Sequence, residues 1–163
     1  MDDTQSVSLA RTIAHALAQM KSVESVPELM TTRSRFAGDA TGFNIELACL
    51  GERSALKPLL EVIAGERILT AGALNAVGLF LPDAQARSAI LEKLETFRGP
   101  QMDTGEQSSA ITVLALRDPG PLVDRVSELY RSGRLHRRAR QKMASLMPQL
   151  IRTEKEHDIR SLN

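Results

Sequence analysis

LKPLLEVIAGERILTAGALNAVGLFLPD, residues 56–83, is the most regular stretch of this sequence. Its first part carries apolar side chains at the spacing of one helix face: Leu56, Leu59, Leu60 and Ile63. Its second part holds another apolar segment, with Leu74 and Leu79 five residues apart. Gly65-Glu66 separates the two parts, and glycine tolerates the left-handed conformation that ends many helices. The stretch therefore predicts two antiparallel helices joined by a short turn.

Similar units recur along the rest of the chain. The first helices of successive units begin their apolar sets 30 to 34 residues apart, at Val26, Leu56, Ile90 and Leu122. The second helices are marked by apolar pairs or, in the last unit, by a less regular segment: Ile45 with Leu50, Leu74 with Leu79, Ile111 with Leu116, and residues 143–150. A single helical hairpin cannot bury its apolar faces alone, so each unit needs neighbours.

Turn-forming residues lie where such two-helix units need them. Gly51 and Gly133 are placed to end helices, and Pro82 and Pro119 cannot continue one. Asp83 and Asp118 are suited to cap the helices that follow them. Before the repeats, the spacing predicts a helix over 7–21 with one apolar stripe: Ala10, Ile13, Leu17 and Met20.

This pattern resembles the HEAT-repeat family of α-solenoids. The resemblance is carried by Leu56-Lys-Pro-Leu-Leu-Glu-Val-Ile63 and Ala73-Leu-Asn-Ala-Val-Gly78, with Glu66 and Arg67 nearest to the acid and arginine that HEAT units often carry. It implies a right-handed stack of antiparallel helix pairs, an α-α superhelix, and an irregular helical bundle is the alternative. We expect one all-α domain: an N-terminal capping helix in 1–25, about four helix pairs in 26–152, and a polar tail in 153–163.

Composition agrees with an all-helical core. Aromatic residues make up 3% of the chain, with no Trp and one Tyr, whereas β-sandwiches favour aromatic and β-branched residues. The single cysteine, Cys49, excludes an intramolecular disulfide, and its apolar neighbours predict a buried thiol. No signal peptide is evident after Met1 and no apolar run spans a bilayer, so we expect a cytoplasmic protein without a membrane partner.

The strongest candidate site is a basic run near the C-terminus. Residues 131–142 hold six cationic side chains and no acid: Arg131, Arg134, Arg137, Arg138, Arg140 and Lys142. On a helix beginning near Arg134, residues 134, 137 and 138 share one face. Such a stripe could bind an acidic protein partner or nucleic acid, because guanidinium groups contact carboxylates and phosphates bidentately. Alternatively it is a solvated face paired with acids such as Asp124 and Glu128.

The second helices offer a further partner-binding surface, because in solenoids they line the concave side. The polar residues expected to be exposed there are Asn44, Glu46, Thr70, Asn75, Gln107, Ser108 and Thr112. Of these, Asn44, Asn75 and Thr112 join the basic run as predicted partner-binding residues.

Reaction chemistry is not indicated anywhere in the sequence. His15, His136 and His157 are far apart, and no zinc, calcium or nucleophile-elbow motif occurs. We therefore predict no catalytic residues, no metal and no cofactor. The predicted function is a non-enzymatic scaffold that binds a protein partner, as an adaptor, a regulator or an inhibitor of the immunity-protein type. The alternative is a nucleic-acid-binding helical domain that uses the basic run, for which Tyr130 would be the one aromatic residue available for base stacking.

Overall fold

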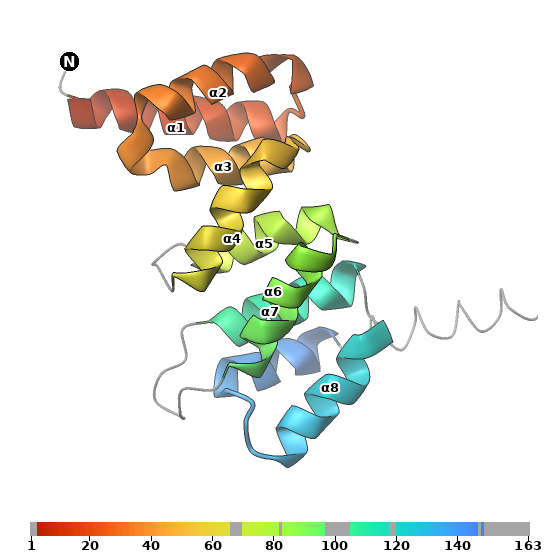
Figure 1. Cartoon of the computed structure of the whole chain (residues 1–163). Helices are drawn as coiled ribbons and strands as arrows, with labels where there is room; N and C mark the ends of the chain where they lie inside the picture. The colour runs from red at the N-terminus through yellow and green to blue at the C-terminus, as the bar shows by residue number, and fades with distance from the viewer. Residues whose placement is uncertain are drawn as a thin grey trace, which may run out of the picture. The chain divides into compact units, whose positions relative to one another are not determined.

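The computed structural model describes residues 3–65, 70–81, 83–96, 105–117, 120–146 and 148. Within them the protein is all-α, without a strand, which confirms the predicted fold class at this level. The α-helices are α1 Asp3–Gln19, α2 Val26–Arg35, α3 Ala40–Cys49, α4 Leu56–Ala64, α5 Thr70–Val77, α6 Ala84–Glu95, α7 Glu106–Arg117 and α8 Gly120–Arg131, followed by a helix over 137–146 (Figure 1). Short 3-10 helices η1 Val23–Ser25, η2 Ala37–Asp39, η3 Arg53–Ala55 and η4 Gly78–Phe80 lie between them.

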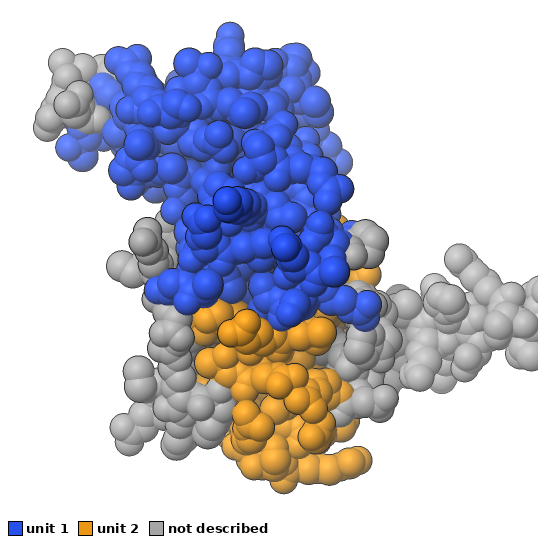
Figure 2. All heavy atoms as spheres, in the orientation of Figure 1, with its two compact units in different colours: residues 1–89 blue, residues 90–163 orange. Residues whose placement is uncertain are grey.

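The chain divides into two compact units, residues 1–89 and 90–163, where the sequence predicts one domain (Figure 2). The predicted tail 153–163, the HEAT-like Glu66 and Arg67, and the predicted cap Asp118 lie outside the described residues.

Unit 1 is organised around α3, which contacts α1, α2, α4 and α5 (Figure 1). Its apolar residues are spread around the helix rather than confined to one stripe, as expected for a helix covered on several sides. Phe43 and Leu47 are fully buried in its core. Helix α4 contributes most of the stripe that the sequence predicts, with Leu56, Leu59 and Ile63 buried and Leu60 half-buried.

Small residues, not large ones, form the buried face of α1. Ala14 and Ala18 are 0% and 6% exposed, whereas Ile13 and Met20 of the predicted stripe are 50% and 76% exposed. The predicted stripe is therefore wrong. The packing side of α1 is thus covered by short apolar side chains, whereas the helical periodicity of the sequence favours the larger apolar residues as the buried ones.

Turn residues behave largely as predicted. Gly51 has φ +84°, and the Glu52 N–H donates to the Leu47 carbonyl at 3.0 Å, so the chain reverses at the end of α3. Asp83 caps α6, because its Oδ1 accepts from the backbone N–H groups of Gln85 and Ala86 at 3.0 and 3.3 Å. Its other oxygen lies 3.0 Å from Arg53, which ties the start of α6 to η3.

Three residues differ from the sequence prediction in whether they are buried or exposed. Cys49 is exposed near the end of α3, so the predicted burial of its thiol is wrong. Asn44 is 3% exposed, and its Oδ1 accepts a hydrogen bond from Arg33 at 3.0 Å. Gln107 is 1% exposed. Both amides are buried and hydrogen-bonded to groups outside their own helices, so the expectation that they face solvent is wrong.

Candidate functional site

The basic run spans the end of α8, a connecting segment and the helix over 137–146. Arg131 is the last residue of α8, Arg134 lies in the connecting segment, and Arg137 is the first helical residue after it. The predicted stripe from Arg134 along one helix is therefore wrong, because that helix begins three residues later. Arg131, Arg134, Arg137, Arg138 and Arg140 are exposed, and Lys142 is half-buried.

A glycine turn sets the start of the connecting segment. Gly133 has φ +69°, and its N–H donates to the Tyr130 carbonyl at 3.1 Å. The next N–H, from Arg134, donates to the Leu129 carbonyl at 2.9 Å. This pair of hydrogen bonds satisfies carbonyls at the end of α8 and turns the chain away from the helix axis.

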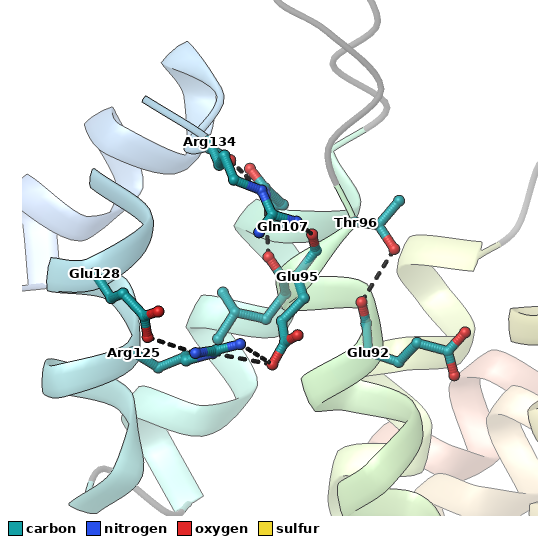
Figure 3. A network of polar contacts seen from close by, with 8 residues as sticks. Glu92, Glu95, Thr96, Gln107, Arg125, Glu128 and Arg134 are labelled. Carbon is teal, nitrogen blue, oxygen red and sulfur yellow. Dashed lines mark hydrogen bonds and ion pairs between the residues drawn. The ribbon is translucent and has the colours of Figure 1, made fainter. Parts of the chain in front are cut away.

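The buried amide of Gln107, on α7, holds the connecting segment in place (Figure 3). Its Nε2 donates to the carbonyls of Leu94 and Arg134, each at 3.0 Å. Its Oε1 accepts from the backbone N–H of His136 at 2.9 Å. The peptide groups on either side of Leu135 are therefore both bound to one side chain, which orients Leu135.

Charged groups add a second attachment in unit 2 (Figure 3). Arg125 of α8 donates through Nη2 and Nε to the Glu95 carboxylate of α6, at 2.8 and 2.9 Å, and through Nη1 to Glu128. Hydrogen bonds to Glu95, then to Glu128, raise the pKa of the Arg125 guanidinium. Arg134 donates to the Glu95 backbone carbonyl at 3.2 Å. Glu128 is thus paired with Arg125, while the Asp124 side chain lies outside the described residues.

A groove of about 480 Å³ lies between α8 and the helix over 137–146. It is lined by Val126, Ser127, Tyr130, Arg131, Leu135, Arg140, Met143 and Ala144. Val126 and Leu135 are each 4% exposed and form its apolar floor, whereas Tyr130 is 62% exposed. A volume of this size falls within the range of sites that accept small apolar groups.

Two cationic side chains border this apolar groove. Arg131 and Arg140 are exposed, and neither forms an ion pair within the described residues. Their guanidinium groups therefore retain donors for carboxylates or phosphates. Arg137 and Arg138 belong to the basic run but do not line the groove.

The described lining offers little for covalent chemistry. Its polar groups are the hydroxyls of Ser127 and Tyr130 and the two guanidinium groups, without a histidine or carboxylate to act as a general base. Nowhere in the described ranges do three or more His, Cys, Asp or Glu side chains gather in a manner that could hold a metal ion. The groove is suited to binding through apolar contact and charge.

The predicted partner-binding residues of the second helices are not among the residues that line this groove. Asn75 is exposed on α5, and Thr112 is half-buried on α7 with its hydroxyl donating to the Ser108 carbonyl at 2.9 Å. Asn44 is buried. The structure therefore brings together Arg131 and Arg140 in one groove, whose lining includes none of these three residues.

A larger groove, of about 740 Å³, lies between α1 and α3 in unit 1. It holds both signs of charge, with His15 Nδ1 3.0 Å from Glu46 Oε1. The Arg11 guanidinium lies against Gly42, where a Cβ would meet its Nε at 2.6 Å. With mixed charge, this groove offers a less defined preference for a partner than the one beside α8.

Apolar lining residues were missed by the sequence analysis. Leu135 interrupts the basic run, and Val126 and Tyr130 lie four residues apart on α8, which are local signals of an apolar surface. That these residues face Met143 follows only from the packing of the two helices.

No helix in the described ranges is long and apolar enough to cross a membrane. Comparisons with protein-family models, curated proteins and solved structures give no significant match.

Proposed function

We propose that this protein is a non-enzymatic binding module, and that the groove between α8 and the helix over 137–146 is its site. The preferred partner is a protein segment that inserts an apolar side chain between Val126 and Leu135 and presents carboxylates to Arg131 and Arg140. Such a module would serve as an adaptor, a regulator or an inhibitor, and it needs no cofactor.

One observation carries this proposal: an apolar floor lies beside two guanidinium groups that are not paired within the described residues. Apolar burial supplies affinity, and the flanking charges select an acidic segment and raise its association rate. If the basic residues formed only a solvated face, no apolar groove beside them would be expected. The exposed ring of Tyr130 also borders the groove, and Tyr is one of the residue types enriched in binding hot spots.

We further infer a HEAT-like stacking of helix pairs as the scaffold. Within unit 1, α2 contacts α3, α4 contacts α5, and α3 contacts both α4 and α5, as adjacent pairs in a solenoid would. Asn75 remains a proposed contact on this scaffold. The exposed single cysteine suits the reducing cytoplasm that we expect for the protein.

Nucleic acid is the second candidate, because Arg137 and Arg138 add exposed cationic groups at the start of their helix. It is less favoured, because Tyr130 is the only aromatic residue among the described residues that line the groove, and stacking there would be limited to one ring. Nucleic-acid binding would draw on the whole basic run and weaken steeply with salt.

Peptide display against the folded protein tests the proposal. We expect selected peptides to share an apolar residue flanked by Asp or Glu. Tyr130 is the only Tyr and there is no Trp, so its fluorescence reports on the groove when the peptide lacks both residues. Binding should protect Tyr130 from acrylamide quenching.

Charge reversal separates the two candidates. Arg131→Glu with Arg140→Glu should weaken a selected peptide at least about tenfold at 0.15 M salt, because attraction becomes repulsion at the groove itself. Arg137→Glu is the matched control, and it should change the affinity less than about threefold. Equal losses of peptide affinity in all variants, or selected peptides without acidic residues, would overturn groove binding. Tight, salt-dependent binding of an oligonucleotide would instead favour nucleic acid as the partner.

A further inference from the structure

Helix α1 carries an exposed apolar face on the side opposite its packing contacts. Leu9 and Ile13 of α1, and Met20 directly after its last residue, are 52%, 50% and 76% exposed, and Ala16 between them is also exposed. Ala14 and Ala18, on the other side of the helix, are buried. The residues that line the groove beside α8 include none from α1.

The spacing of these residues is that of a helix-pairing seam. Positions 9, 13, 16 and 20 alternate steps of four and three residues, the repeat that keeps a seam facing a second helix. The residues along one edge of the seam are uncharged: Gln5, Thr12 and Gln19. The face therefore favours another helix, and it meets no like-charge repulsion if that helix has the same sequence.

We propose that the occupant is α1 of a second copy of this chain, packed antiparallel about a two-fold axis. In the register where residue numbers of facing positions sum to 29, Ile13 lies opposite Ala16 of the other copy, and Leu9 lies opposite Met20. Bulky residues then face small or adaptable ones at every level. A parallel pair would place Ala16 against Ala16 and leave a gap at that level. The antiparallel arrangement also opposes the two helix dipoles.

The size of the seam makes the dimer reversible. Helix α1 has 17 residues, a length of about 25 Å, and four seam positions per copy bury less than the roughly 1,200 Å² of a standard stable interface. We expect a monomer–dimer equilibrium with half association at roughly 10–500 μM, in the weak range for interfaces of this size.

Sedimentation velocity across that concentration range is the first test. Wild type should move from monomer toward dimer as its concentration rises. Ile13→Glu should stay monomeric, because it places a charge beside the two-fold axis of the dimer. Circular dichroism should show that the helix of this variant is intact. The matched control is Leu116→Glu, because Leu116 is also apolar and 67% exposed but lies on α7. This control should dimerise like wild type. A monomer at all concentrations, or a dimer that persists in Ile13→Glu, would overturn the proposal.

Spin labels test the orientation independently. With Cys49 replaced by serine, a cysteine-linked label at Gln5 should lie about 30 Å from its copy, and one at Thr12 about 12 Å, from the rise per residue and the usual separation of packed helices. A parallel pair would give about 10 Å at both positions. Equal short distances, or no coupling between labels at dimer concentrations, would contradict the antiparallel register.

Discussion

Replacing Gln107 with alanine tests how the groove is held together. The substitution removes three hydrogen bonds, to the Leu94 carbonyl, the Arg134 carbonyl and the His136 N–H. His136 is 5% exposed, so its N–H loses its partner in a place that water does not readily reach. An orphaned buried donor costs about 1–3 kcal/mol.

The full effect is larger than the loss of that one donor. The Leu94 carbonyl also loses a partner, and the space left by the amide becomes a small cavity, so we expect a total loss of about 3 kcal/mol in the free energy of unfolding. Gln107→Met refills the space but cannot donate or accept as the amide does. It should recover only about 1 kcal/mol of the loss.

Urea unfolding followed by circular dichroism measures this change, and hydrogen exchange of the His136 amide locates it. The control is Gln141→Ala, an exposed glutamine of the same unit, which should change stability by less than about 0.5 kcal/mol. Because Gln107 fixes both peptide groups beside Leu135, Gln107→Ala should also weaken peptide binding in the groove. If Gln107→Ala is as stable as Gln141→Ala, or the His136 amide keeps its protection, the reasoning fails.

Substitutions at three further places probe other parts of the structure. Lys93 and Glu106 are 4% and 7% exposed with Nζ and Oε2 3.9 Å apart, so Lys93→Met should cost about 3 kcal/mol in urea unfolding by leaving a buried carboxylate, and adding Glu106→Gln should restore most of it. Lys21 has φ +55°, so Lys21→Gly should raise stability by about 1 kcal/mol, and an unchanged or lower unfolding midpoint would contradict this. The Ser54 backbone N–H donates to Glu52 and lowers the pKa of Glu52 below 4.5. The stabilisation from this hydrogen bond is present above pH 4.5 and declines as the pH falls through the lowered pKa. Glu52→Ala should therefore lose under about 1 kcal/mol near pH 7 and progressively less below pH 4.5, measured by unfolding across this range.

The positions of helices were predictable because their signals are local. Val26 and Leu56 begin α2 and α4, and Asp83 caps α6, as the spacing of apolar residues and turn formers predicts. Glycine and capping residues act on neighbouring backbone groups, so a single sequence carries their information.

The polar residues of the second helices were not predictable in this way. Gln107 satisfies groups 13 to 29 residues away, and Asn44 satisfies Arg33 on the preceding helix. Both look like surface residues when only neighbours in sequence are considered. Their burial follows from long-range packing, because buried polar groups are tolerated where hydrogen-bond partners meet them.

The candidate site was half predictable. Its charge is visible in the sequence, since Arg131 and Arg140 stand in a run without acids. Its apolar floor is not, because Val126 and Leu135 come together only when α8 and the helix over 137–146 pack. Arg134 was wrongly placed on that helix, because the turn at Gly133 carries the chain three residues further before the helix begins.

In unit 2, the residue that holds the groove together and the residues that would contact a partner belong to different helices. Gln107, which anchors the segment beneath the groove, belongs to α7, whereas the exposed side chains that would meet a partner belong to α8 and the helix over 137–146. The exposed side chains around the groove can therefore be changed without removing the hydrogen bonds of Gln107. A library that varies Ser127, Arg131, Arg140 and Ala144 while keeping Gln107 should retain folded members with new specificities, so the same framework could be retargeted during evolution or by design.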